Sequence, residues 1–308
     1  MRLVVLSGSA HPALAEGICT GLGIAAGARE LGRFPDGEPR VVVGEPVRGA
    51  DVYLVQPLGP PADCHLVELL LLADACRRAG AARITAIVPY LAFARQDRRH
   101  AEGEPHGARL AADLISARVD LAVAVDVHGS GAEGYFSVPF EHLTALPALA
   151  AALSGRFPDP VVVAPDLGAA RRAEALGALL DAPTACVHKT RVSPREVQAR
   201  LVSGEVAGRT PIVVDDMIST GATIEAAVRV LHEASCRDEV IVTATHGLLV
   251  EGAVARLGRL GLARVVVSDS LPVARSAQLD VELVSIAPLL VEAIRRLRAG
   301  AALTDLRA

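Results

Sequence analysis

The sequence has few aromatic residues and no tryptophan. Aromatic side chains make up 3% of its 308 residues, so its cores must be built from Ala, Val and Leu, as is typical of helices packed on parallel strands. Scarce aromatic rings also argue against single-stranded nucleic acid as a ligand, because bases stack on such rings. The formal net charge of −4 argues against nucleic acid too, since phosphate-backbone binders usually carry a basic face.

Lysine is nearly absent. The sequence has 31 basic residues other than histidine, and only one of them, Lys189, is a lysine. A compositional bias has made arginine the default cation, and one lysine could survive that bias by chance. The alternative hypothesis is that position 189 requires a compact ammonium, which a planar guanidinium cannot replace.

Cysteine pairs, signal sequences and long apolar runs are lacking as well. The five cysteines show no metal-like spacing, and their odd number does not suit a disulfide framework, so a reducing cytoplasm is the expected location. The apolar run at the amino terminus is too short for a signal peptide. The run "LLLLADA" after Glu68 is interrupted by charge, so no membrane span is expected.

Short apolar runs that alternate with helical patterns are present along the whole chain. Examples are "DVYLVQP" before a helical pattern over 63–79 and "PVVVAPD" before one over 168–180. This alternation predicts an α/β fold of mostly parallel sheets with helices on both faces. A Gly- and Pro-containing stretch at 151–160 suggests a boundary between two similar domains, 1–150 and 151–308.

The stretch "IVVDDMISTGATI" at 212–224 is the strongest candidate site. A buried-type strand leads into Asp215 and Asp216, and a helix with apolar residues at helical spacing follows. Amide groups and hydroxyls at a helix amino terminus bind phosphate, and a glycine allows the backbone to approach the ligand. We therefore expect a phosphate-binding loop, although such a loop could by itself be a simple helix cap. The loop residues are Ser219, Thr220, Gly221, Ala222 and Thr223.

Further polar groups follow other predicted strands. "ARQDRR" comes after "ITAIVPY", and its Arg95, Gln96 and Asp97 combine a cation, an amide and a carboxylate suited to a polyphosphate and metal-bound water. His128 follows another strand, and Asp166 a third. A solvated charge run and a structural histidine are the ordinary alternatives. Position at the carboxyl ends of parallel strands favours ligand binding.

Six motifs in order resemble the ribose-phosphate diphosphokinases (phosphoribosyl-diphosphate synthetases), which have the type I phosphoribosyltransferase fold. The motifs are "RFPDGE" (33–38), "VPYLAFARQDRR" (88–99), "DVHGSGAEGYF" (126–136), "APDLG" (164–168), "VHKTR" (187–191) and "VVDDMISTGAT" (213–223). The resemblance implies transfer of the diphosphoryl group of ATP to the anomeric hydroxyl of ribose 5-phosphate.

The resemblance also implies roles for individual residues. Lys189 and Arg191 would be the catalytic basic pair, at the start of a flexible loop over the reacting phosphates. His128 and Asp166 would lie at Mg²⁺, which prefers oxygen ligands and retained waters. Ribose 5-phosphate would bind Asp215, Asp216 and the loop 219–223. ATP would bind Arg95, Gln96, Asp97 and His128, together with Phe34, Asp36 and Glu38 of a neighbouring subunit, which implies a homo-oligomer, a dimer or a hexamer.

Three positions depart from the regulated members of that family. Gly103 stands where those members place an Arg, and Gly131 where they place a Gln, so we expect little activation by phosphate or inhibition by ADP at a regulatory site. Ser219 replaces an Asp common in those members. The alternatives are a phosphoribosyltransferase that consumes phosphoribosyl diphosphate and a non-catalytic regulatory subunit. A phosphoribosyltransferase has no use for "ARQDRR" together with "VHKTR". A regulatory subunit would be expected to lose the catalytic basic pair, which this chain keeps.

Overall fold

A computed structural model describes residues 1–99, 101–129, 131–193, 196–250, 252–274 and 276–307, with the side chains of 189–201 outside the description. The chain forms two compact units. The first comprises Met1–Thr144, Ser270–Pro272 and Ile286–Ala308, and the second Ala145–Asp269 and Val273–Ser285. None of the helices in these described stretches combines the length and apolarity that crossing a membrane requires.

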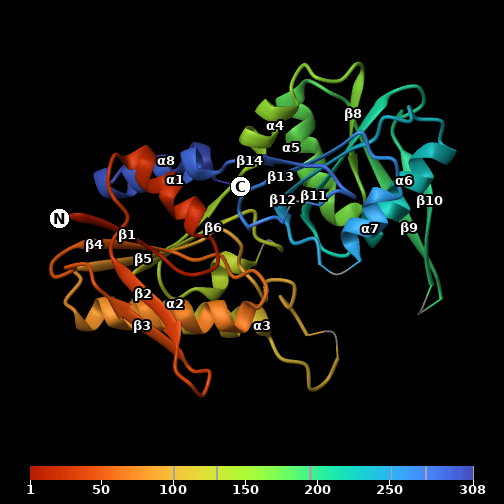
Figure 1. The fold of residues 1–308 in the computed structure, drawn as a ribbon. Helices are drawn as coiled ribbons and strands as arrows, with labels where there is room; N and C mark the ends of the chain where they lie inside the picture. The colour runs from red at the N-terminus through yellow and green to blue at the C-terminus, as the bar shows by residue number, and fades with distance from the viewer. Residues whose placement is uncertain (100, 130, 194–195, 251, 275, 308) are drawn as a thin grey trace. The chain divides into compact units, whose positions relative to one another are not determined.

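The first unit is a parallel sheet between two layers of helices (Figure 1). Its strand order is β1-β4-β5-β6-β7. The strands are β1 (Leu3–Ser7), β4 (Asp51–Val55), β5 (Arg83–Val88), β6 (Leu121–Val125) and β7 (Phe140–Leu143). The helices are α1 (Pro12–Leu22) and α8 (Ala287–Ala299) on one face, α2 (Ala62–Arg78) and α3 (Gly107–Ser116) on the other, and the short helices η1 (Ala132–Tyr135) and η3 (Thr304–Leu306).

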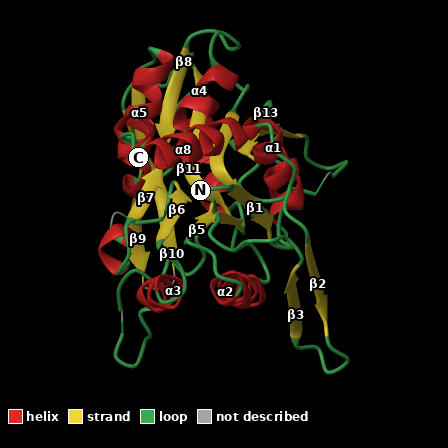
Figure 2. Ribbon diagram, turned by 90° about the vertical axis from the view of Figure 1, so that its left-hand side faces the viewer, coloured by secondary structure: helices red, strands yellow, loops and turns green. Residues whose placement is uncertain are grey.

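An antiparallel hairpin stands apart from that sheet. Strands β2 (Arg29–Arg33) and β3 (Pro39–Val43) pair with each other, and β3 packs on α2. Figure 2 shows the hairpin on the far side of α2 from α3. Gly32, Arg33 and Pro39, next to the tip of the hairpin, line a pocket together with the first turn of α2.

The second unit is a larger sheet in the order β10-β9-β8-β11-β12-β13-β14, parallel except for the antiparallel β9–β10 pair. The strands are β8 (Pro160–Ala164), β9 (Thr184–Ser193), β10 (Glu196–Ser203), β11 (Thr210–Ile218), β12 (Ile241–Gly247), β13 (Arg264–Ser268) and β14 (Val281–Val284). The helices are α4 (Leu146–Leu153), η2 (Leu167–Ala169), α5 (Ala170–Leu180), α6 (Ala222–Glu233) and α7 (Ala253–Gly258).

The predicted α/β class is confirmed. The helical spacing of apolar residues determines where the helices form. The expected apolar face of α6 is buried: Ile224, Ala227, Val228 and Leu231 are each at most 2% exposed. That face packs into a core shared with the interior side chains of β8, β11 and β12. The helix after the candidate loop is thus held by tertiary packing, which gives the loop a rigid support.

The unit boundaries differ from the single division expected near residue 150. The chain leaves the first unit after Thr144, and its last segment, Ile286–Ala308, belongs to that unit rather than to the second. The reason is packing: α8 lies against α1, and Leu290 and Ile294 of α8 are fully buried. The guanidinium of Arg295 also donates to the carbonyl of Gly21 at 2.7 Å.

Candidate functional site

The first group of predicted site residues lies just beyond the carboxyl end of β5. The chain turns sharply there, and Phe93 takes a left-handed φ of 64° that bulky residues rarely adopt. The amide of Gln96 closes the turn by donating to the carbonyl of Phe93 at 2.8 Å. The turn leaves Arg95 and Gln96 exposed and Asp97 half-buried.

Asp97 connects this turn to the segment that follows β6. Its Oδ2 atom lies 3.2 Å from the place that a Cβ atom on Gly129 would take. The backbone carbonyl of Asp97 accepts hydrogen bonds from the imidazole of His106 and from the Tyr135 hydroxyl at 2.8 Å. The structure thus brings the "ARQDRR" turn next to His128 and Gly129, as two strands ending at the same sheet edge should.

The approach to His128 has an unusual backbone. Asp126 is 2% exposed, has a φ of 42°, and accepts a hydrogen bond from the Thr144 hydroxyl at 2.9 Å. The next amide, of Val127, donates to Nε2 of His142 at 2.8 Å. These bonds turn the chain out of the sheet, and the His128 side chain is exposed. Backbone strain of this kind is concentrated at functional sites.

The other predicted ATP contacts belong to the β2–β3 hairpin, which lies on the far side of α2 from α3 (Figure 2). The tip is closed by the amide of Phe34, which donates to the carbonyl of Glu38 at 2.8 Å, and by the Asp36 carboxylate, which accepts from the Glu38 amide at 3.1 Å. The Phe34 ring is 48% exposed at this tip.

In the second unit, the carboxylates Asp215 and Asp216 lie inside β11 rather than after it. The strand continues to Ile218 because Asp215, Met217 and Ile218 stay in register with β12. The pKa of Asp215 is raised to about 8 by burial and by the neighbouring Asp216 and Asp166, because each of these disfavours the ionised form of Asp215. The region would therefore favour a bound cation or sugar hydroxyls.

The loop 219–223 has the geometry expected of a phosphate loop. Gly221 is the N-cap of α6 with a φ of 76°, and no side chain accepts a hydrogen bond in the manner of an N-cap. A Cβ atom at Gly221 would lie 3.1 Å from Cδ2 of Leu257, so both conformation and space require glycine. The amide of Ala222 donates a long hydrogen bond, 3.4 Å, to the hydroxyl oxygen of Thr220. The first turn of α6 thus presents backbone amides to an anion.

Asp166 follows β8, the strand next to β11. One carboxylate oxygen accepts from the Gly168 amide at 3.0 Å, which caps the short helix η2. Burial and the charge of Asp166 raise the pKa of the nearby Cys186 thiol. Asp166 therefore acts electrostatically on both β9 and β11, in the middle of the sheet.

The predicted catalytic pair lies on β9. The backbone of this strand pairs with β10, with Lys189 opposite Ala199 and Arg191 opposite Val197, so the segment expected as a flexible loop is an antiparallel hairpin over its described part. The side chains of Lys189 and Arg191 lie outside the described residues. Their roles stay predictions.

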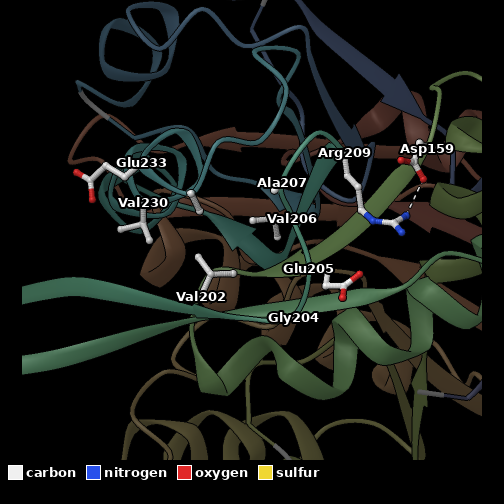
Figure 3. A pocket seen from close by; sticks show the side chains of 10 residues that line it. Asp159, Val202, Gly204, Glu205, Val206, Ala207, Arg209, Val230 and Glu233 are labelled. Carbon is white, nitrogen blue, oxygen red and sulfur yellow. Dashed lines mark hydrogen bonds and ion pairs between the residues drawn. The ribbon is translucent and has the colours of Figure 1, made fainter.

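A separate cavity of about 570 Å³ lies at the opposite edge of this sheet (Figure 3). Asp159 and Arg209, which form an ion pair at 2.6 Å, precede β8 and β11 and line it together with Val202, Val206 and Val230. Parallel sheets bind ligands at the carboxyl ends of their strands, where the loop 219–223 lies. This cavity is thus not the candidate site.

Sequence reasoning missed the groups that hold these segments in place. The sequence did not predict His106 and Tyr135, which donate to the carbonyl of Asp97. It also did not predict Arg256, which donates to the carbonyl of Thr220. Tyr135 and Arg256 lie more than thirty positions from the residues that they hold, and His106 lies nine positions from Asp97, so no helix or strand spacing indicates these bonds.

Comparison with known proteins gives consistent matches. Residues 3–118 match the family described as the N-terminal domain of ribose phosphate pyrophosphokinase, and residues 184–307 match the phosphoribosyl synthetase-associated domain. A ribose-phosphate pyrophosphokinase of Parasynechococcus marenigrum is 42% identical over 301 residues, which cover 96% of this chain and 91% of that protein. One of Mycobacterium leprae is 39% identical over 312 residues, covering 99% and 95%.

A solved structure also matches over nearly the whole chain. The phosphoribosylpyrophosphate synthetase from Mycobacterium smegmatis aligns with a TM-score of 0.90 at 38% identity, covering 98% of this chain and 100% of that one.

Proposed function

Because the chain belongs to the ribose-phosphate pyrophosphokinase family, we propose that it transfers the diphosphoryl group of ATP to the anomeric hydroxyl of ribose 5-phosphate. The products are 5-phosphoribosyl 1-diphosphate and AMP. The chain is thus an enzyme of nucleotide biosynthesis. The cytoplasm suits it, since all five of its cysteines are free thiols.

The observation that carries this proposal is the loop 219–223 with its two carboxylates. Gly221 opens the first turn of α6 to the 5-phosphate, while Asp216, 8% exposed, and Asp215 are placed to accept the ribose hydroxyls. ATP binds in the first unit, at Arg95, Gln96, Asp97 and His128. The Asp97–Gly129 contact supports a single nucleotide subsite there.

The reaction needs no side-chain nucleophile. The anomeric hydroxyl attacks the β-phosphorus of ATP in line, and AMP leaves. Negative charge spreads over phosphate oxygens in the transition state, so preorganised cations lower the barrier most. Lys189 and Arg191 supply those cations, and the β9–β10 hairpin that carries them shields ATP from water.

Magnesium fits the donor set. Within the described residues, no three His, Cys, Asp or Glu side chains converge as a complete metal site. Mg²⁺ does not require one, since it keeps several waters and uses one or two carboxylates plus substrate phosphates. Burial raises the pKa of Asp215 most, and the charges of Asp216 and Asp166 raise it further. A cation would relieve the repulsion among these carboxylates. Asp166 would hold this cation in the second unit, and His128 would lie near another Mg²⁺ at the nucleotide in the first unit. When bound, these cations would neutralise phosphate charge.

Two labelled substrates test the activity. With ribose 5-phosphate and Mg²⁺, label in the β-phosphate of ATP should appear in phosphoribosyl diphosphate, and label in the α-phosphate should remain in AMP. An enzyme that instead consumes phosphoribosyl diphosphate with a free base, and forms no AMP, would contradict the proposal.

We also propose a homo-oligomer in which each nucleotide subsite is completed by Phe34, Asp36 and Glu38 of a neighbouring subunit. The exposed Phe34 at the hairpin tip supports this arrangement. The test mixes two inactive variants, Phe34→Ala and Lys189→Ala. If the hairpin acts across subunits, hybrids contain intact sites and the mixture recovers activity that neither variant has alone. Absence of recovery in oligomers shown to exchange subunits would contradict it.

Regulation by phosphate and ADP at a separate site is not expected. Gly103 has a φ of 82°, a conformation that strains any side chain. A Cβ atom at Gly131 would lie 3.1 Å from the Tyr135 hydroxyl, which is engaged with Asp97. Both positions therefore favour glycine over the Arg and Gln of the regulated members. Sigmoidal activation by phosphate at saturating substrate would overturn this, whereas ADP competition at the ATP subsite would not.

A further inference from the structure

The segment after β12 lies directly against the loop 219–223. The amide of Leu249 donates to the carbonyl of Ile218 at 2.9 Å, and the amide of Val250 donates to the carbonyl of Ser219 at 3.2 Å. Leu249 adopts a left-handed φ of 44° there. A leucine rarely adopts this conformation, because its Cβ atom then crowds the backbone. The surrounding bonds therefore impose the path of the segment.

Arg256, on α7, also contacts the loop 219–223. Its Nη1 group donates to the carbonyl of Thr220, and its Nε group pairs with Glu225 in the first turn of α6 at 3.0 Å. The neighbouring Leu257 packs where a Cβ atom on Gly221 would be, and α7 lies beside α6 (Figure 1). One guanidinium thus ties the loop to the helix that follows it.

These bonds orient the loop amides. Three consecutive carbonyls, of Ile218, Ser219 and Thr220, face the segment after β12, where they accept from Leu249, Val250 and Arg256. In a trans peptide the carbonyl of one residue and the N–H of the next point in opposite directions. The N–H groups of residues 219, 220 and 221 must therefore point away from that segment. Successive N–H groups directed to one side form a concave anion site.

We propose that Arg256 is the positioning residue of the phosphate loop and determines its affinity for ribose 5-phosphate. Its guanidinium touches no substrate. It holds the peptide between Thr220 and Gly221 with its N–H toward the 5-phosphate, and its ion pair with Glu225 keeps the arginine in place. This inference rests on the proposed function and adds a positioning residue to the same site.

The test compares Arg256→Gln with Arg259→Gln, a matched control at the exposed end of the same helix. Arg256→Gln should raise the KM for ribose 5-phosphate roughly 10- to 100-fold, the effect of losing a charge-assisted hydrogen bond. The KM for ATP should change less than about twofold, as should both constants in Arg259→Gln, in keeping with an exposed substitution. Calorimetric titration with ribose 5-phosphate should show the same loss of affinity without turnover.

Arg256→Lys provides the second comparison, because an ammonium can reach the Thr220 carbonyl or Glu225 but lacks the planar fork that serves both. Its KM for ribose 5-phosphate should lie between those of the wild type and Arg256→Gln, at an unchanged melting temperature. An active wild type with the same ribose 5-phosphate KM in all three variants would overturn the inference. An inactive wild type would instead overturn the proposed function.

Discussion

One carboxylate oxygen of Asp97 lies 3.2 Å from the point that a Cβ atom on Gly129 would occupy. The two residues belong to turns after neighbouring parallel strands, β5 and β6. A side chain at position 129 would therefore require Asp97 to shift. The proposed ATP subsite is built from these two turns.

Gly129→Ala is therefore expected to weaken the use of ATP. The methyl group must displace Asp97, and alanine at the φ of 84° found at Gly129 adds about 1–2 kcal/mol of strain. We expect the KM for ATP to rise about tenfold, with the KM for ribose 5-phosphate nearly unchanged, in steady-state kinetics. Gly49→Ala is the control, because Gly49 has a φ of 66° but open space around it. Equal effects of both variants on the KM for ATP would contradict this prediction.

Asp216→Asn should impair the use of ribose 5-phosphate far more than that of ATP. Loss of a charged hydrogen bond in a site costs about 2–3 kcal/mol, so the KM for the sugar should rise by more than tenfold. Asp238→Asn, at an exposed position of the same unit, should leave both Michaelis constants unchanged. If Asp216→Asn bound ATP poorly with a normal KM for ribose 5-phosphate, our assignment of the loop would be wrong.

The carboxylates of β11 should make stability depend on pH in metal-free buffer. The pKa of Asp215 rises from 3.8 to about 8 on folding, so the folded chain holds this proton more tightly than the unfolded chain does. The resulting stabilisation is complete below about pH 4 and is lost as the pH rises towards 8. Asp215→Asn cannot ionise, so it should be the more stable protein at pH 9, by about 1–3 kcal/mol.

Denaturant unfolding at pH 6 and pH 9, with chelator and then with Mg²⁺, measures this effect. In chelator, the free energy of unfolding of Asp215→Asn should exceed that of the wild type by more at pH 9 than at pH 6. This difference should shrink when Mg²⁺ is added, because a nearby cation favours the ionised carboxylate. An advantage of equal size at both pH values would show that Asp215 does not titrate in this range.

Lys189→Ala and Lys189→Arg should both reduce turnover. Removal of one preorganised donor to a developing phosphoryl charge lowers the rate roughly 10²- to 10³-fold, with little change in melting temperature. Because Lys189 is the only lysine, an amine-selective reagent can modify only this side chain and the chain's amino terminus. MgATP should protect the activity. Full turnover after complete labelling of Lys189 would mean that this lysine is not catalytic.

Much of the architecture could be predicted from local sequence. The alternation of apolar runs and helical patterns indicated the α/β class, since strand and helix periods depend only on residues a few positions apart. The buried face of α6 and the glycine before it were both predictable, because an amphipathic stripe and a left-handed cap are local requirements. The candidate loop was found by the same reasoning.

Other features depend on which segments meet after folding. Packing against α1 decides that α8 joins the first unit, and pairing with β12 carries β11 past Asp215 and Asp216. The contacts of Asp97 with Gly129 and of Arg256 with Thr220 each join residues more than thirty positions apart. The sequence alone determined which chemical groups this protein has and the local elements that carry them. Only the tertiary structure decided how those groups are oriented, because hydrogen bonds and packing between distant segments set the direction of each carbonyl and amide in the site.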